Sequence, residues 1–242
     1  MGRRARRFGN GVEERDRFSN LLQDFLGPQY EVLNFGHPGN NMPDHLQELE
    51  QVLTFSPDFV LLQLYENDFE TPNMTRNRPR AFPLLPSDLD TRIEQPSLLY
   101  RLMVDRWDQL QERIGLDESY THYMARHLRD PNSPDARAGF GMLEQFIERA
   151  RAGGVPSGGV LFPALYGLGQ KGAAYPFDYL NDRIRMIYTV EQTPYLDLLP
   201  VFSTIRDPRS LWVSLFDAHP NAKANHLAAI AILNKFEALW HH

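Results

Sequence analysis

Nearly continuous apolar runs alternate with amphipathic helical patterns along this chain, and this alternation restricts its fold more than any other feature. The runs that predict strands are 30–35, 59–65, 159–165 and 195–199. Apolar residues at helical spacing predict helices over 12–26, 45–55, 98–114, 119–128, 136–152, 177–190 and 222–240. Strands separated by helices of this length are typical of crossover units, so we expect a parallel sheet with helices on both faces.

The chain has no internal repeat and no break in composition that would divide it. Its 242 residues are enough for one large buried core. A polar stretch over 71–96 contains five prolines, and we interpret it as a surface insertion or lid. With the helices that follow, the insertion is expected to occupy 71–135 of a single domain over 1–242. The expected fold class is a three-layer α/β/α domain with a helical insertion.

Composition excludes several kinds of function. There is no cysteine, so disulfides, thiolate catalysis and cysteine-ligated metal sites are ruled out. The net charge of −6 argues against a nucleic-acid partner, which would need a basic surface. No apolar run approaches the ~18 residues of a membrane span. The arginine-rich start over 1–7 is not followed by the apolar core of a secretion signal, so the chain as written is expected to be cytoplasmic.

Three polar segments follow strand-like runs or precede the last helix, at what would be the carboxyl edge of the sheet. They are 34–40 (NFGHPGN), 65–68 (YEND) and 217–220 (DAHP). Open α/β folds place their ligands at this edge. Each segment also has a purely structural interpretation. Gly39 is typical of a turn, Asn67 and Asp68 of a turn cap, and Asp217 with His219 of a helix start.

A metal-dependent hydrolytic site built from Asp68, Asp217 and His219 is a further interpretation of the same residues. A carboxylate and an imidazole both bind metal ions. No second histidine cluster accompanies these residues, so a bound metal is not the expectation.

Taken together and in this order, the three segments resemble the SGNH branch of the GDSL hydrolases. The resemblance runs from about Phe8 to the C-terminus and implies a flavodoxin-like fold and serine-dependent ester chemistry without a cofactor. It implies that Gly39 and Asn67 donate hydrogen bonds in the oxyanion hole. It also implies that His219 is the general base and that Asp217 orients it. An imidazole suits the base because its pKa lies near neutrality, and preorganised N–H donors stabilise the oxyanion of a tetrahedral intermediate.

The family's nucleophile does not appear in this sequence. Family members read Gly-Asp-Ser, two variable residues and then Phe-Gly-x-Gly-Val, and the second part matches Phe8 to Val12. Counting back places the serine on Ala5, and Arg3 and Arg4 stand where the glycine and aspartate should be. We therefore expect the nucleophile and the first strand to be missing, through truncation, a frame shift or natural loss. If a segment is missing here, the cellular location is open.

The expected function is that of a serine esterase or lipase-like hydrolase acting on a small-molecule or carbohydrate ester, such as an O-acetylated sugar. This chain is expected to be impaired because it lacks the serine. Two alternatives stay open: a catalytically inactive protein that binds the ligand in the same cleft, and an O-acyltransferase of the same fold. The oligomeric state cannot be read from the sequence.

Overall fold

A parallel sheet of three strands forms the middle of the molecule, in the order β1 (Val60–Tyr65), β2 (Ser157–Phe162) and β3 (Tyr195–Asp197). The computed structural model describes residues 11–71, 82–86, 89, 92–93, 97–118, 120–168, 174–215 and 217–240. In the register of the sheet, Tyr65 lies opposite Phe162 and Leu161 lies opposite Asp197. The expected parallel sheet is confirmed, and β1 and β2 end side by side.

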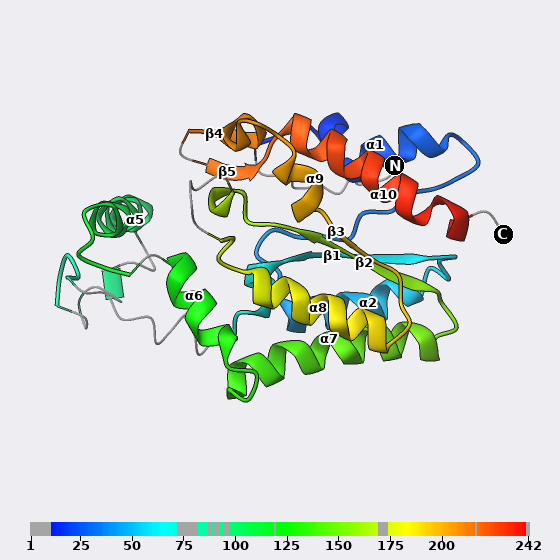
Figure 1. Ribbon diagram of the computed structural model, residues 1–242, viewed down its shortest axis with the longest axis horizontal. Helices are drawn as coiled ribbons and strands as arrows, with labels where there is room; N and C mark the ends of the chain where they lie inside the picture. Colours follow the sequence, from blue (N-terminus) through cyan, green and yellow to red (C-terminus); the bar gives the residue numbers. More distant parts are fainter. Residues whose placement is uncertain are drawn as a thin grey trace.

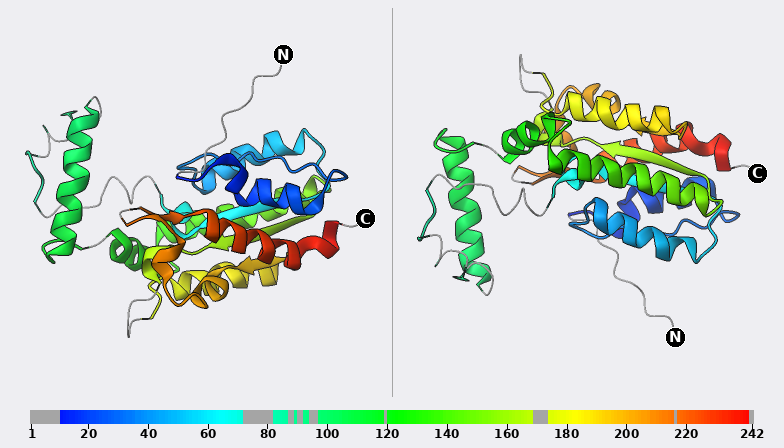
Figure 2. Two further views of the ribbon diagram at one scale, coloured as in Figure 1. Left: turned by 90° about the horizontal axis from the view of Figure 1, so that it is seen from above. Right: turned by 90° about the horizontal axis from the view of Figure 1, so that it is seen from below.

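Helices cover both faces of this sheet (Figure 1). One face carries α2 (Met42–Leu53), α7 (Pro134–Ala152) and α8 (Asp178–Val190). The other carries α1 (Phe18–Leu26), α10 (Ala222–Trp240) and the short α9 (Leu199–Ser203). Seen from above, α1 and α10 lie in front of the sheet, and seen from below, α2, α7 and α8 lie in front of it (Figure 2). The expected α/β/α arrangement is therefore confirmed.

The core has two parts, one on each face of the sheet. Along β2, Leu161 belongs to the cluster shared with α2, α7 and α8, while Val160 and Phe162 belong to the cluster shared with α1 and α10. Successive side chains of a strand point to opposite faces, so an unbroken apolar run suits a strand that is covered on both sides. This explains why β1 and β2 lack an alternating polar pattern.

The segment 30–35 is not a strand, contrary to the sequence prediction. Its backbone is held by one side chain of α1. Gln23 Nε2 donates to the carbonyl of Tyr30 at 2.8 Å, and the N–H of Val32 donates to Gln23 Oε1 at 2.7 Å. A strand requires a neighbouring strand to pair with, and local β propensity cannot supply one. In the described sheet β1 pairs with β2 alone.

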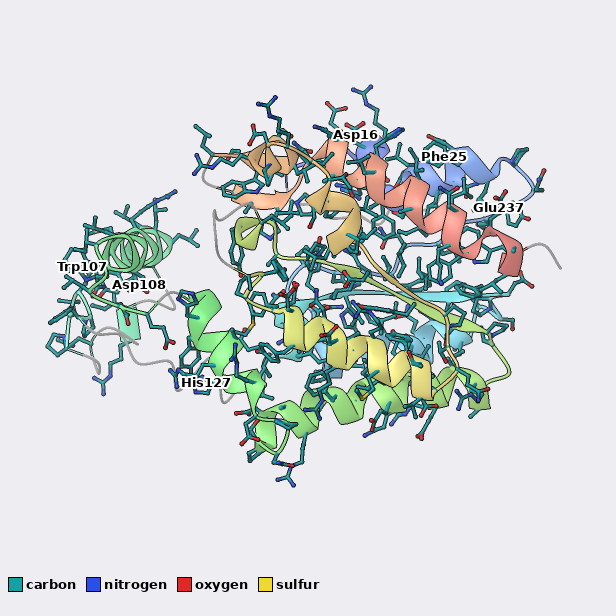
Figure 3. All side chains as sticks on the ribbon, in the orientation of Figure 1. Asp16, Phe25, Trp107, Asp108, His127 and Glu237 are labelled. Carbon is teal, nitrogen blue, oxygen red and sulfur yellow. The ribbon has the colours of Figure 1, made fainter. Side chains whose placement is uncertain are left out.

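The predicted helices over 98–114 and 119–128 are observed as α5 (Leu98–Arg113) and α6 (Tyr120–Arg129). Helix α5 lies apart from the three layers in all views (Figures 1 and 2). Trp107, labelled on this helix in Figure 3, donates from Nε1 to the carbonyl of Phe82 at 2.6 Å. Thr71 Oγ1 donates a hydrogen bond to Asp135, which joins the two ends of the expected insertion. Most of 71–96 lies outside the described residues, and the division into one domain with an insertion stays a prediction.

The remaining elements are short. Two strands, β4 (Trp212–Ser214) and β5 (Asp217–Pro220), form a separate antiparallel pair. Single 3-10 turns occur at Glu14–Asp16, Glu66–Phe69, Leu165–Gly167 and Pro208–Leu211. Within the described ranges, no helix has the length and apolar character needed to cross a bilayer.

Candidate active site

The β4–β5 pair lies at the end of the sheet where β1 and β2 terminate (Figure 1). It packs against the Leu165–Gly167 turn that follows β2. It also meets the start of the described chain, because a Cβ built on Gly11 would lie 2.3 Å from Val213 Cγ1. Asp217 and His219 are therefore placed at the carboxyl edge of the sheet. They lie in a strand that the sequence did not predict.

Asp217 and His219 contact each other directly. His219 Nδ1 lies 2.5 Å from Asp217 Oδ1, and the His219 backbone N–H donates to the same oxygen at 3.0 Å. Burial raises the pKa of Asp217, but the hydrogen bonds and charge of His219 outweigh it, so the net pKa lies below its ordinary value. An ionised carboxylate accepts a hydrogen bond from Nδ1–H, and in that tautomer the Nε2 lone pair is free. The described residues provide no hydrogen bond to Nε2, and 60% of the His219 side chain is exposed.

The start of α10 is capped by another residue. Asn221 Oδ1 accepts from the N–H of Ala224 at 3.1 Å, and its Nδ2 donates to the carbonyls of Ser210 and Trp212, each at 2.9 Å. Asn221 therefore caps the start of α10. Asp217 and His219 do not cap this helix and instead contact each other. Asn221 could have been recognised from its position immediately before the apolar helical run.

Asn225 is a second polar residue that the sequence analysis missed. Its Oδ1 accepts from the N–H of Phe18 at 3.1 Å, and its Nδ2 donates to the carbonyl of Pro220 at 3.1 Å. This buried side chain joins the start of α1 to the end of β5. One partner is 207 positions away, so no local pattern could have indicated the contact.

Asn67 lies in the 3-10 turn Glu66–Phe69, directly after β1. Its side chain is exposed, whereas the acidic residues on either side of it are buried, with Glu66 1% and Asp68 5% exposed. Asp68 Oδ2 accepts from the N–H of Tyr65 at 2.8 Å. The turn-cap interpretation thus holds for Asp68, and it leaves the Asn67 side chain facing outward.

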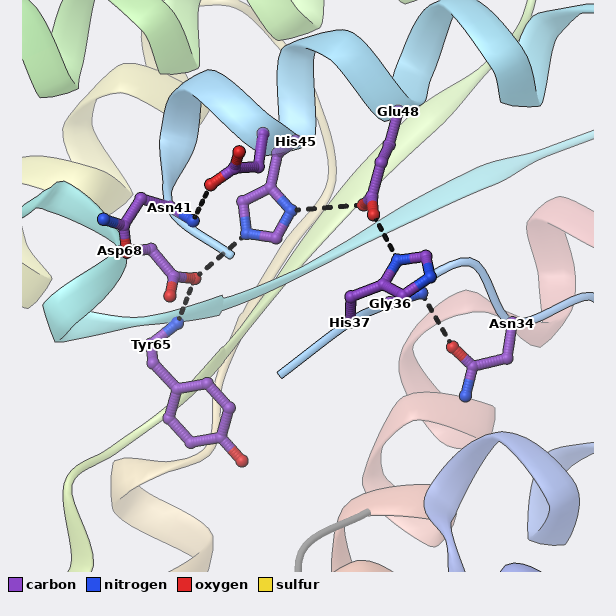
Figure 4. Close-up of polar contacts among 9 residues, drawn as sticks. Asn34, Gly36, His37, Asn41, His45, Glu48, Tyr65 and Asp68 are labelled. Carbon is purple, nitrogen blue, oxygen red and sulfur yellow. Dashed lines mark hydrogen bonds and ion pairs between the residues drawn. The ribbon is translucent and has the colours of Figure 1, made fainter. Parts of the chain in front are cut away.

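Asp68 is the first of a series of polar side chains that contact one another along α2 (Figure 4). His45 Nε2 lies 3.3 Å from Asp68 Oδ2, and His45 Nδ1 lies 3.9 Å from Glu48 Oε2. Glu48 in turn contacts His37 Nδ1 at 2.6 Å. Burial raises the pKa of Asp68, and the hydrogen bond and charge of His45 partly oppose it. Helix α2 therefore links the Asn67 turn to the loop that holds Gly39.

Gly39 occupies that exposed loop with a φ of +81°, the left-handed region that favours glycine. Nothing lies within 4 Å of a Cβ built on it. The turn interpretation therefore accounts for this residue's conformation. The three segments are placed around one edge, but within the described chain no hydrogen bond connects Gly39, Asn67 and His219 directly.

Glu66 was not singled out from the sequence. Its Oε2 accepts from the N–H of Ala164 at 3.0 Å, and its Oε1 lies 2.5 Å from Tyr175 Oη. Burial raises the pKa of Glu66 to about 8, against the partial opposition of these hydrogen bonds. The available signal was a carboxylate directly after a nearly continuous apolar run, because burial at the end of such a strand limits its access to water.

The residues proposed for a metal alternative are divided between two groups. Asp68 contacts His45, whereas Asp217 contacts His219. Across the ranges that the structure describes, no group of three or more His, Cys, Asp or Glu side chains is arranged to hold a metal ion. Ala5, the residue at the expected nucleophile position, lies outside the described residues.

Comparison with known proteins gives one family match. The model of the GDSL-like Lipase/Acylhydrolase family matches residues 7–227, which include all three segments of the candidate site. Neither the curated proteins nor the solved structures contain a significant match. With this match over most of its length and a parallel sheet covered by helices, the chain belongs to the GDSL-like lipase/acylhydrolase family.

Proposed function

We propose that this chain carries the base and oxyanion parts of an ester hydrolase site but lacks its serine nucleophile. His219 is the general base, Asp217 orients it, and Gly39 and Asn67 donate to the oxyanion. The family hydrolyses esters. The observation that carries the assignment is the 2.5 Å contact between His219 Nδ1 and Asp217 Oδ1, which leaves Nε2 as a proton acceptor.

The chemistry follows from these groups. His219 Nε2 removes a proton from the attacking water, and the adjacent Asp217 carboxylate stabilises the resulting imidazolium. The carbonyl oxygen gains negative charge as the tetrahedral intermediate forms. The exposed amide of Asn67 and the backbone N–H at Gly39 are neutral donors suited to that charge. When the tetrahedral intermediate collapses, the bond to the alcohol oxygen breaks and the imidazolium returns the proton to the leaving alcohol.

Ala5 has no hydroxyl, so no acyl-enzyme forms at the position of the family serine. Water is then the only attacking group, and the rate should be that of an impaired site. Sites that lack one member of a catalytic triad retain ~10³–10⁴-fold acceleration over water. For the substrate we propose a small-molecule or carbohydrate ester, with an acetylated sugar as the first choice.

The test is hydrolysis of p-nitrophenyl acetate by the wild type and three variants. We expect slow hydrolysis without an initial burst, about 100-fold slower in Asn67→Ala and close to background in His219→Ala. The matched control is His226→Ala, which removes an exposed histidine of α10 and should change nothing. Equal rates in all four proteins would contradict the proposed site. Rapid turnover that His219→Ala abolishes would keep the site but contradict the impairment.

Product analysis separates the two alternatives. Incubation with an acetyl donor and a sugar acceptor gives free acetate if the site hydrolyses esters and an acetylated sugar if it transfers the acyl group. Calorimetric binding of an acetylated oligosaccharide with no product over hours would identify an inactive binding protein.

A further inference from the structure

We propose that Glu66 is a positioning residue, which clamps the Asn67 turn to the segment after β2 through Tyr175 and Ala164. Glu66 immediately precedes Asn67, and its carboxyl group is buried beneath the turn. Its two oxygens contact groups 98 and 109 positions away in the sequence. A single side chain therefore joins the end of β1 to the loop after β2 and to the segment before α8.

An ionised Glu66 accepts from both Tyr175 and the Ala164 N–H, and a proton on its carboxyl group would in addition free the Tyr175 hydroxyl for the Ala164 carbonyl. Tyr175 Oη lies 2.5 Å from Glu66 Oε1 and 3.5 Å from the carbonyl of Ala164. One hydroxyl has one proton, so it cannot donate fully to both oxygens. With Glu66 neutral, Oε1–H donates to Tyr175 Oη, Tyr175 donates to the Ala164 carbonyl, and the Ala164 N–H donates to Oε2. Every polar group of this ring of hydrogen bonds is then satisfied.

The surroundings of Glu66 favour this neutral form. Its closest titratable neighbours are acidic or phenolic, and the described basic residues provide no ion pair to it. Asp197 raises the pKa of Glu66, and Glu66 in turn raises those of nearby tyrosines. Arg185, which lowers the pKa of the neighbouring Tyr195, pairs with Asp197 at 3.1 Å. The groups that face Glu66 are Tyr65, Tyr175, Tyr195 and Asp197.

The consequence for the site is that a proton on Glu66 holds Asn67 in place. Asp68 fixes the other side of the turn through Tyr65 and His45, so Asn67 is exposed between two buried anchors. Loss of the Glu66 proton opens the ring at the Ala164 carbonyl and places a charge in the core. A role for Asn67 in the oxyanion hole rests on the proposed function, but the clamp itself is measurable without any ester.

The experiment compares the wild type with Glu66→Gln and Glu66→Ala, and uses Glu50→Gln as the control on an exposed glutamate. Thermal unfolding is followed from pH 5 to pH 9, and amide exchange gives the protection of the Ala164 N–H. A group whose folded pKa is raised to about 8 from 4.5 stabilises the fold below that window, and the stabilisation is lost as pH rises through it. We expect the wild-type Tm to fall by about 3 °C per pH unit between pH 5 and pH 8 from this group.

Glutamine imitates the neutral acid, so Glu66→Gln should remove that slope and keep the Ala164 amide protected. Glu66→Ala should lower the protection at least tenfold, and Glu50→Gln should follow the wild type. A wild-type slope in Glu66→Gln, or unchanged protection in Glu66→Ala, would overturn the clamp.

The rate of slow ester hydrolysis tests whether Glu66 positions Asn67 for the proposed reaction. It should fall in Glu66→Ala as it does in Asn67→Ala, and Glu66→Gln should restore it. If Asn67→Ala slows hydrolysis and Glu66→Ala does not, the positioning role is wrong and the proposed function stands. If Asn67→Ala has no effect while the pH slope behaves as expected, the oxyanion assignment is wrong and the clamp stands.

Discussion

The Asn67 turn and the β4–β5 pair both carry candidate site residues, but they are held in opposite ways. The turn depends on buried carboxyl groups whose partners come from distant parts of the chain. Asp217 and His219 are two positions apart, and 37% and 60% of their side chains are exposed. The turn is thus a product of the whole fold, whereas the Asp217–His219 contact is local.

This difference indicates which region contributes mainly to the stability of the fold and which mainly to the proposed chemistry. A buried hydrogen-bonded carboxyl group leaves its partners unsatisfied when it is removed, and the fold loses that free energy. An exposed pair is screened by water, so its removal costs the fold little and affects the chemistry instead. The predictions below test this separation.

The largest contrast should come from the same substitution in both regions. Asp68→Ala leaves the Tyr65 N–H and His45 Nε2 without their partner, and we expect a loss of about 2–3 kcal/mol in the free energy of unfolding. Asp217→Ala should change it by no more than ~0.5 kcal/mol, as is usual for surface sites. Urea denaturation of both variants measures the difference. Equal losses would show that the β4–β5 pair is as much a part of the core as the turn.

A smaller effect should come from the close approach of Val213 in β4 to the start of the described chain. Gly11 has a φ of +80°, and a Cβ there would lie 2.3 Å from Val213 Cγ1. Gly11→Ala combines backbone strain with a clash, and we expect a loss of about 2 kcal/mol. Gly154→Ala is the control because Gly154 has a φ of +74° with nothing within 4 Å. Its loss should be about 1 kcal/mol, from strain alone.

The difference between these two alanine variants isolates the steric term, which thermal unfolding can measure. If both lose the same amount, Val213 moves aside freely and the start of the described chain does not hold β4 in place. The β4–β5 pair would then depend even less than expected on distant parts of the chain, in contrast to the Asn67 turn.

The sequence predicted what depends on local pattern. The apolar run over 59–65 and the helical spacing over 98–114 and 222–240 correspond closely to β1, α5 and α10. The prediction failed for 30–35, because apolar residues with β propensity form a strand only beside a pairing partner. Gln23 holds this segment instead, and side-chain to backbone contacts of that kind leave no periodic signal.

The same division applies to the site. The resemblance to the SGNH hydrolases implied the contact between Asp217 and His219, which the structure contains. The burial of Glu66 and its bonds to Ala164 and Tyr175 arise only when segments about a hundred residues apart come together. The roles of Gly39, Asn67, Asp217 and His219 in ester chemistry stay predictions, to be tested by the variants above.

The smallest expected effect concerns pH, and its sign differs between the two regions. The net pKa of Asp217 lies below its ordinary value of 3.8, so its contribution to stability is present above that pH and is lost as pH falls through the folded pKa. Glu66 acts in the opposite direction, between pH 4.5 and about 8. Because Asp217 is partly exposed, Asp217→Asn should lower the Tm by less than ~2 °C at pH 5. This deficit should shrink steadily toward pH 3.

An NMR titration of the Asp217 carboxyl group measures the cause directly. In the wild type its pKa should lie below the ordinary range, and His219→Ala should raise it because the hydrogen bond and the charge of the ring are lost. The backbone N–H of residue 219 still donates to the carboxylate in that variant, so the pKa should not rise far. A wild-type pKa above the ordinary range would mean that burial dominates at both places. The two regions would then share one electrostatic character, and the free Nε2 of His219 would no longer follow from an ionised Asp217.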